Sequence, residues 1–482
     1  MPQSRTTTVI VASAVAIGVI ADHLFRAPVW GVNVALAAGM LAAAGMAMPS
    51  AEPRAPWAWL AAVFFATMWA VRDAPLLLVD LLAALSLTSL PLLGERSLQL
   101  RAVDLFNLLT APLRTAWIIS FGTLDFAHIV RSRAFPAREG SGRARAIGAG
   151  VLVATPLVLL FGALFASADP VFDVAISSVF TSNVGPFISH GISAAALAWA
   201  TAGYLWVLAK PPRAPTALFE IPSIGGLQVL TPLIAILVLF ALFIGVQASS
   251  LFGGAEFVET TTGLTFAEYA RGGFFQLVFA SMLVLPLLYF APAIAGPLDD
   301  RGTRNLQAVM AAQIGLTGLV LASALWRMGL YVGAYGLTED RINGTAIMVW
   351  IAATLGVFAF TVVRGRPRHA AFGSLVAAVA TLAALNLMNP NATIARYNLA
   401  HQQGREIDFE HLASLGGDAV PVLVSGIDLV PPAWRCRLIA DLRTRYLTPK
   451  GDWRGWNLAR ERAREAVAGL EPVEACPSVT DP

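Results

Sequence analysis

Residues 345–388 read TAIMVWIAATLGVFAFTVVRGRPRHAAFGSLVAAVATLAALNLM. Two apolar stretches of 19 residues each, 345–363 and 370–388, flank a short loop that contains three arginines. A helix needs roughly 20 apolar residues to span the hydrocarbon core of a bilayer, which is about 30 Å thick. The pattern therefore predicts two transmembrane helices that are joined by a loop in water.

The same pattern recurs along the first 389 residues, where eleven segments are apolar enough to cross a membrane. The sequence therefore predicts an all-α protein, a polytopic helical membrane bundle of about 11 transmembrane helices with a small soluble α-helical C-terminal domain. Ala and Gly recur in most of these segments, as in membrane helices that pack closely. The predicted crossings are 8–25, 29–48, 56–72, 74–93, 147–168, 187–209, 227–252, 272–295, 305–333, 345–363 and 370–388.

Charged residues divide the chain into two parts. They make up 13% of the 482 residues, about half the share that is usual in soluble domains. Residues 390–482 hold 23 of the 63 charged side chains, and residues 1–389 hold the other 40. This step predicts a transmembrane domain over residues 1–389 and a soluble, extracytoplasmic helical domain over residues 390–482.

Two helices are predicted near the end of the chain. Pro431-Pro432 favours a helix start, and this helix should run to about Tyr446. Asp452 has a side chain suited to cap a second helix, which should run from Trp453 to about Ala468. Both belong to the predicted soluble domain.

Loop charges predict the orientation in the membrane. Residues 95–146 carry eight arginines, and loops rich in Lys and Arg stay in the cytoplasm. Since four crossings precede this loop, we expect the N-terminus in the cytoplasm and the C-terminus outside it. The later loops agree, because those expected inside hold seven Lys and Arg and those expected outside hold two. The inside loops are 210–226, 296–304 and 364–369, and the outside loops are 169–186, 253–271 and 334–344.

The basic residues are 31 Arg and two Lys. Together with abundant Ala, this usage indicates a bacterium with a GC-rich genome, and we expect the chain in the bacterial cytoplasmic (inner) membrane. The net charge of +3 does not indicate nucleic acid as a partner, because most of the arginines lie in short loops between apolar segments. The expected partner is the lipid bilayer.

Residues 103–126 are apolar but are predicted to lie in the membrane interface on the cytoplasmic side rather than to cross. Asp104, Asn107 and Arg114 share one helical face with Ala111, and the leucines lie on the other faces. That distribution is typical of an amphipathic interfacial helix. A crossing here would also invert every later loop and violate the charge bias.

Polar residues gather at the predicted outer ends of several helices. In the ninth segment Arg327, Tyr331 and Tyr335 are spaced by four residues and form one stripe. A pocket for a small anionic ligand, a lipid headgroup or a protein partner is one interpretation, and a structural layer of salt bridges is the other. Arg327 is expected to pair with Glu268 or Asp169, because a lone charge at membrane depth is costly. The candidate cluster is Asp169, Glu268, Tyr269, Arg271, Arg327, Tyr331, Tyr335, Asn389 and Arg396.

Asp80 is the candidate intramembrane acid and the one charged residue of the fourth apolar segment. It is either a proton or ion site or the neighbour of a polar group on a packed helix. His401, Asp408, Glu410 and His411 follow no defined metal spacing, so a solvated helix face is expected there and no metal. No P-loop, HExxH, CxxC or GxSxG motif is present, and no cofactor or catalytic residue is predicted.

Both cysteines of the chain, Cys436 and Cys476, lie in the part predicted to be outside the cytoplasm. Disulfides persist in oxidising compartments. We therefore expect these two residues to form a structural disulfide, with two unpaired thiols as the alternative.

Several stretches together resemble a family of bacterial multi-pass membrane proteins of unknown function, DUF4173 or its sister family DUF4153. The resemblance spans nearly the whole chain. It implies a bacterial inner-membrane protein, and it carries no assigned substrate, cofactor or catalytic residue. The stretches are ADHLF from residue 21, FASADPVF from 165, FAEYARGGFF from 266, RMGLY from 327, YGLT from 335, NP from 389, IARYN from 394, LGGDAVP from 415 and WRGWN from 453.

These observations favour a non-enzymatic sensory, regulatory or envelope-associated protein with an extracytoplasmic polar binding layer. Two alternatives stay open. A secondary transporter would use deep ionisable groups such as Asp80. A membrane enzyme acting on a lipid-linked substrate would use Asp169 and Glu268 as acid and base, if they lie within about 10 Å of each other.

Overall fold

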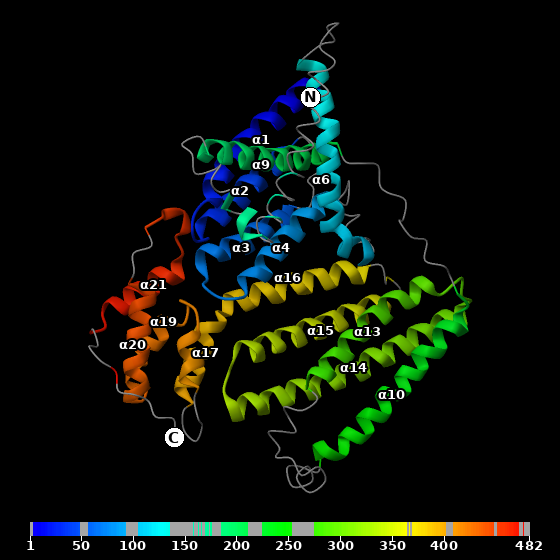
Figure 1. Ribbon diagram of the computed structural model, residues 1–482. Coiled ribbons are helices and arrows are strands. Elements are labelled where there is room, and N and C mark those ends of the chain that lie inside the picture. The colour runs from blue at the N-terminus through cyan, green and yellow to red at the C-terminus, as the bar shows by residue number, and fades with distance from the viewer. Residues whose placement is uncertain are drawn as a thin grey trace.

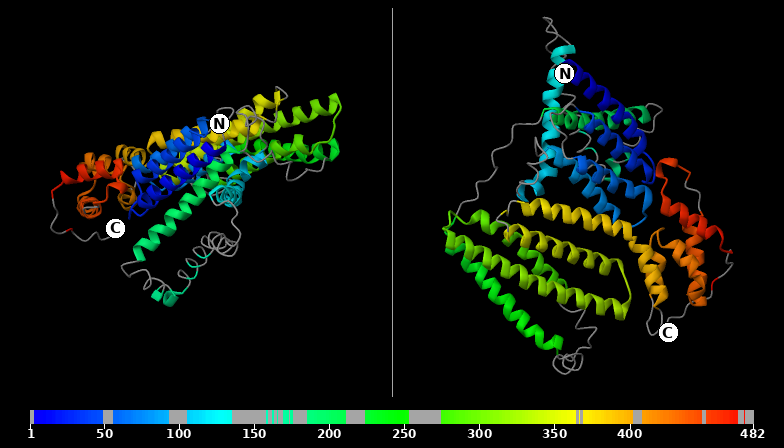
Figure 2. Two further views of the ribbon diagram at one scale, coloured as in Figure 1. Left: turned by 90° about the horizontal axis from the view of Figure 1, so that it is seen from above. Right: turned by 180° about the vertical axis from the view of Figure 1, so that it is seen from behind.

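The computed structural model is all-helical over the part of the chain that it describes (Figure 1). Its helices form an N-terminal group, a second group and a C-terminal group, and Figure 2 shows these from above and from behind. The described residues are 3–48, 56–92, 105–134, 185–210, 224–252, 274–363, 369–401, 408–447 and 451–471, with 158, 162, 165, 169–172, 174–175, 366 and 476.

The N-terminal group is built around pairs of closely packed apolar helices. α1 lies along α9, and α9 also packs against α6. Trp59 and Tyr204 meet edge to face with ring centroids 5.8 Å apart, so α3 contacts the same core. The helices are α1 (Gln3–Phe25), α2 (Val32–Met46), α3 (Pro56–Val71), α4 (Leu77–Ser89), α6 (Leu105–Ala134) and α9 (Gly185–Ala209), with a short 3-10 turn at Leu90–Leu92 after α4.

The second group encloses a separate apolar core. Its fully buried side chains include Leu288, Met310 and Phe358, which lie on three different helices. Trp57 and Phe372, with ring centroids 5.7 Å apart, join α16 to α3 of the first group. The helices are α10 (Gly226–Phe252), α13 (Phe274–Ile294), α14 (Asp300–Tyr335), α15 (Glu339–Val363) and α16 (Ala370–Met388).

The C-terminal group packs on one end of the bundle. Its core of Leu412, Leu423 and Leu442 also includes Ile342 and Leu385 of the bundle, so the C-terminal group packs directly on bundle helices. The group consists of α17 (Pro390–Ala400), α18 (Phe409–Ser414), α19 (Val420–Ser425), α20 (Pro432–Tyr446) and α21 (Leu458–Ala468), with 3-10 turns at Ile427–Leu429 and Trp453–Gly455.

Caps explain where the last two helices begin. α20 begins at Pro432, as the double proline predicted. The prediction that Asp452 caps the next helix was wrong, because its side chain accepts from the Arg454 amide and closes only a 3-10 turn. The helix α21 begins later, where the Asn457 side chain accepts from the Arg460 amide.

The described cysteines are bonded to each other. Cys436 of α20 and Cys476 form a disulfide, with their Cα atoms 5.5 Å apart. The bond attaches the end of the chain to α20 across 40 residues of sequence.

Seven described helices are long and apolar enough to cross a membrane, which indicates a multi-pass membrane protein. They coincide with seven of the eleven predicted crossings. α2, α3 and the unit Leu77–Leu92 match three more but are shorter apolar helices of 10–17 residues. Most of the predicted crossing 147–168 lies outside the described residues.

The predicted interfacial segment 103–126 belongs to a longer helix, α6, which runs to Ala134. Ala111 is fully buried, whereas the side chains of Leu109 and Leu113 are exposed. The small residue therefore faces the bundle and the leucines face away from it.

Candidate functional site

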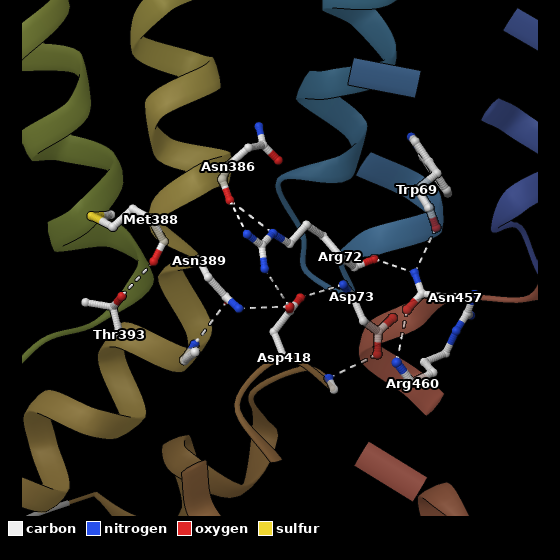
Figure 3. A network of polar contacts seen from close by, with 12 residues as sticks. Trp69, Arg72, Asp73, Asn386, Met388, Asn389, Thr393, Asp418, Asn457 and Arg460 are labelled. Carbon is white, nitrogen blue, oxygen red and sulfur yellow. Dashed lines mark hydrogen bonds and ion pairs between the residues drawn. The ribbon is translucent and has the colours of Figure 1, made fainter. Parts of the chain in front are cut away.

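A network of polar contacts joins the bundle to the C-terminal helices (Figure 3). We call it the polar joint and define it as Arg72, Asp73, Asn386, Asn389, Asp418 and Asn457. Arg72 follows α3, and its Nη1 donates to Asp418 Oδ1 at 3.2 Å. The same guanidinium donates to the carbonyl oxygen of Asn386 from Nε at 3.0 Å and from Nη2 at 2.6 Å.

Asp418 is the buried centre of the polar joint. Besides Arg72, its carboxylate accepts from the backbone amide of Asp73 at 2.6 Å and from Asn389 Nδ2 at 3.0 Å. Burial raises the pKa of Asp418, while the Asp73 amide and the Arg72 guanidinium act in the opposite direction. Asn389 stands in the left-handed region at φ 57° and also caps α17.

The two glycines before Asp418 allow the chain to come close to the turn after α3. The Gly417 amide donates to Asp73 Oδ2 at 3.0 Å. A Cβ atom at Gly416 would lie 1.8 Å from the carbonyl oxygen of Asp73, closer than any side chain tolerates. The LGGD stretch is therefore a docking motif in this fold.

Asn457 holds the second contact of the polar joint. Its Nδ2 donates to the carbonyl oxygens of Trp69 at 2.8 Å and Arg72 at 2.6 Å. Nearby, the Val32 amide donates to the carbonyl oxygen of Trp456 at 2.9 Å. The WRGWN stretch thus attaches the start of α21 to the start of α2 and the end of α3.

Asp80 lies next to the polar joint and contacts it through Asn386. It is fully buried, and its Oδ1 accepts from Asn386 Nδ2 at 2.8 Å. This contact matches the interpretation that Asp80 neighbours a polar group of a packed helix. Asn386 therefore contacts both Asp80 with its side chain and Arg72 with its carbonyl oxygen.

A cavity of about 570 Å³ lies beside the turn between α14 and α15. We call it the junction pocket, because its walls come from both the bundle and the C-terminal helices. Its volume falls within the roughly 300–1,000 Å³ of typical small-molecule sites. The pocket is lined by Phe274, Phe275, Met328, Tyr331, Tyr335, Gly336, Leu337, Thr338, Asp340, Arg341, Asn398, His401, Asp408 and His411.

Arg341 organises the bundle wall of the junction pocket. Its guanidinium lies 4.1 Å from the ring centroid of Tyr331, a cation–π distance. Its Nη1 donates to the carbonyl oxygens of Tyr335 at 2.9 Å and Gly336 at 2.5 Å. The arginine is therefore fixed against the end of α14 with its charge beside the pocket.

Asn398 fixes the opposite wall. Its Oδ1 accepts from the Leu337 amide and its Nδ2 donates to the Leu337 carbonyl oxygen, both at 2.8 Å. This paired contact holds α17 to the turn between α14 and α15. The pocket therefore depends on the docked position of the C-terminal helices.

The sequence model of one family, Domain of unknown function (DUF4153), matches residues 59–426 of the chain. That range covers more than half of the 482 residues. The chain belongs to the DUF4153 family. No curated protein and no solved structure matches it.

The family match supports DUF4153 among the two sister families that the sequence resembles. Within this DUF4153 protein, the matched range contains Arg72, Asp80 and Asp418 as well as the whole junction pocket. It ends before the disulfide and before Asn457. The family as such carries no assigned activity.

Only part of the predicted polar cluster comes together in the described part of this DUF4153 protein. Tyr331 and Tyr335 meet edge to face, with ring centroids 5.2 Å apart, and both line the junction pocket. Arg327 is buried within α14 one turn earlier. Asn389 belongs to the polar joint instead, and Arg396 is exposed on α17.

The predicted acidic partners lie elsewhere. Asp169 is exposed and accepts from the Val171 amide at 2.7 Å, as a local cap. Glu268, Tyr269 and Arg271 lie outside the described residues. The pairing of Arg327 with a carboxylate and the acid–base role of Asp169 and Glu268 therefore stay predictions.

A second polar group joins α1 to α9. Asp22 Oδ2 lies 2.5 Å from His190 Nδ1, and Asp22 Oδ1 accepts from Arg26 Nε at 2.9 Å and from Ser193 Oγ. These residue types occur in nucleophilic triads, but here the serine hydroxyl donates to the carboxylate and not to the imidazole. The group is an anchor between two helix ends. The sequence indicated only single members of it, such as Asp22 in the ADHLF stretch, and not their contact.

Proposed function

We propose that this DUF4153 protein is a non-enzymatic binding protein of the bacterial inner membrane, with a sensory or regulatory role, and that it binds its ligand in the junction pocket. The observation that carries the proposal is the composition of the pocket walls. Tyr331, Tyr335 and Arg341 come from the bundle, whereas Asn398 and His411 come from the C-terminal helices. A ligand there would contact both parts of the protein at once.

The proposed orientation puts the junction pocket on the extracytoplasmic face. It rests on the seven-to-two bias of Lys and Arg between the loops. The pocket lies beside residues 336–338, between two candidate spans, in a loop expected outside. The disulfide between Cys436 and Cys476 suits the same side of the membrane.

Binding in the junction pocket would be coupled to docking of the C-terminal helices. A ligand that binds only the docked arrangement stabilises that arrangement by mass action. The polar joint and the Asn398 contact hold the same two parts together. The docked position of the C-terminal helices is therefore the proposed signal that reports on the ligand.

A secondary transporter is the second candidate function, and Asp80 favours it. Its Oδ1 accepts from Asn386, but its buried Oδ2 has no hydrogen-bond partner within the described part of the chain. An ionisable group of this kind is suited to bind a proton or cation. If the protein is a transporter, Asp80→Asn should abolish transport. The proposed binding function should survive this substitution.

A pocket-blocking variant tests the proposed binding function. Thr338→Trp places an indole at the wall of the junction pocket, and Ser425→Trp, at an exposed residue of α19, is the matched control. Native mass spectrometry of protein purified from its own membrane should detect a bound small molecule or lipid in the wild type and in Ser425→Trp. The same species should be lost in Thr338→Trp. No bound species in the wild type, or equal occupancy in all three proteins, would overturn the proposal.

A further inference from the structure

The junction pocket lies at the depth of membrane headgroups. Three candidate spans end on it: Phe274–Ile294 begins at its wall, Asp300–Tyr335 ends there, and Glu339–Thr361 begins just beyond. The ends of spans mark the boundary between the hydrocarbon core and the headgroup layer. A ligand in this pocket is therefore level with the polar part of a lipid.

One wall of the junction pocket is apolar and continues toward the bilayer. Phe275 is 71% exposed beside the buried Phe274, and Met328 lies on the neighbouring helix. Phe partitions favourably from water into the bilayer on insertion scales. The glycerol and upper acyl chain of a lipid would find apolar contacts along this wall.

Two buried nitrogen atoms lie beside the polar part of the pocket. Arg341 Nε and His411 Nε2 have no hydrogen-bond partner among the described residues. No described carboxylate forms an ion pair with Arg341. Both atoms are covered by protein, so a ligand in the pocket would meet the other N–H groups of these two side chains, which line its wall. The oxygen atoms of a phosphate group are well suited to accept from such groups.

The pocket also contains negative charge. Asp340 is exposed at its rim, and Asp408 lines it while capping α18 through the His411 amide at 2.8 Å. A purely anionic ligand would be repelled by both carboxylates. A ligand that carries an ammonium group next to its phosphate would instead satisfy both signs of charge.

We propose that the junction pocket binds the headgroup of a zwitterionic phospholipid of the phosphatidylethanolamine type. The phosphate lies between Arg341 and His411, the primary ammonium faces Asp340 and Asp408, and the apolar part follows Phe274 and Phe275. The proposal rests on the proposed binding function and names its ligand class.

Lipids with different headgroups test this assignment on the full-length protein in detergent. The probes are dihexanoyl phosphatidylethanolamine, phosphatidylcholine and phosphatidylglycerol, with free phosphoethanolamine as the soluble source of the same chemistry. Binding is measured by microscale thermophoresis. We expect phosphatidylethanolamine to bind at least about 10-fold tighter than phosphatidylglycerol, which lacks the ammonium, and tighter than phosphatidylcholine, whose quaternary ammonium donates no N–H bond. Free phosphoethanolamine should bind more weakly because it leaves the apolar wall unused.

Two variants test the negative and the positive charge of the junction pocket one at a time. Asp340→Asn should remove most of the preference for phosphatidylethanolamine over phosphatidylglycerol, and Arg341→Gln should weaken the binding of all three lipids. Asp428→Asn, at a carboxylate that is 93% exposed and outside the pocket, should change neither. Asp340 is exposed, so its variant tests the proposal even where Arg341→Gln lowers the folded yield.

The outcomes distinguish this inference from the function on which it rests. Equal affinity for all three headgroups overturns the headgroup assignment, and so does an unchanged preference in Asp340→Asn. Tight binding of free phosphoethanolamine would assign the pocket to a soluble ligand and overturn the lipid. A bound species that Thr338→Trp displaces, but that is not phosphatidylethanolamine, overturns the headgroup alone and leaves the binding function standing. If no bound species depends on the pocket, both the headgroup assignment and the binding function are overturned.

Discussion

Arg72 donates two hydrogen bonds to the carbonyl oxygen of Asn386, from Nε at 3.0 Å and from Nη2 at 2.6 Å, although the two residues are 314 positions apart in the sequence. Asn386 lies near the end of α16, and its side chain reaches Asp80 inside the bundle. Arg72 also contacts Asp418 of the C-terminal group. One arginine therefore connects two bundle helices and the C-terminal helices.

Loss of Arg72 should destabilise the protein. Arg72→Ala leaves Asp418 buried without its charged partner, and losing hydrogen bonds to charged groups costs roughly 1.5–3 kcal/mol. The melting temperature in detergent should fall by several degrees relative to wild type. Arg396→Ala, at an exposed arginine of α17, is the control and should melt like the wild type. Equal melting temperatures for the two variants would contradict the role of Arg72.

A single methyl group should disturb docking of the C-terminal helices. In Gly416→Ala the new Cβ would lie 1.8 Å from the carbonyl oxygen of Asp73, so the chain must move away from the turn after α3. Limited proteolysis should then cleave the C-terminal helices faster. Gly451→Ala adds its Cβ where nothing lies within 4 Å and should be cleaved at the wild-type rate. An unchanged rate in Gly416→Ala would mean that the close approach is not needed.

Asp418 should make stability depend on pH. Its pKa is raised above the ordinary 3.8, so the folded state holds its proton more tightly than the unfolded state. The stabilisation that protonated Asp418 provides is fully present below pH 3.8 and is lost as the pH rises through the folded pKa. The melting temperature of Asp418→Asn minus that of wild type should therefore become more positive as the pH rises through the folded pKa of Asp418. A difference that becomes more negative over the same range would show that the ionised carboxylate is the stabilising form.

The disulfide should stabilise the C-terminal helices. It closes a loop of 40 residues between Cys436 and Cys476, for which the chain-entropy estimate is roughly 4 kcal/mol. Cys436→Ser with Cys476→Ser should therefore lower the melting temperature. Mass spectrometry of protein from the native membrane, alkylated without reduction, should find both thiols protected. Alkylation of both cysteines under these conditions would exclude the bridge in the cell.

The helices could be predicted from the sequence because long apolar runs give a strong signal in residues such as 370–388. The stripe of Tyr331 and Tyr335 followed from helical spacing, and both residues line the junction pocket. Arg341 was missed because an arginine next to a membrane span resembles an ordinary topology charge. Its role depends on packing against Tyr331.

The polar joint could not be predicted from one sequence, because its members lie far apart along the chain. Arg72 and Asp418 are 346 residues apart, and Arg72 and Asn386 are 314 apart. The sequence offered only indirect signals, such as the charged pair Arg72-Asp73 between the third and fourth apolar segments and the LGGD stretch from residue 415. These residues contact one another only because the fold brings the ends of α3, α16 and α19 together.

The junction pocket should be open on the extracytoplasmic face and should hold a ligand there. Thr338→Cys puts a single reactive thiol on the pocket wall, since the native cysteines are bonded to each other. Arg366→Cys, in the loop expected in the cytoplasm, is the matched control. In intact spheroplasts a membrane-impermeant maleimide should label position 338 and not position 366, and excess dihexanoyl phosphatidylethanolamine should slow the labelling at 338. Labelling of position 366 alone in intact spheroplasts would invert the orientation and contradict the account.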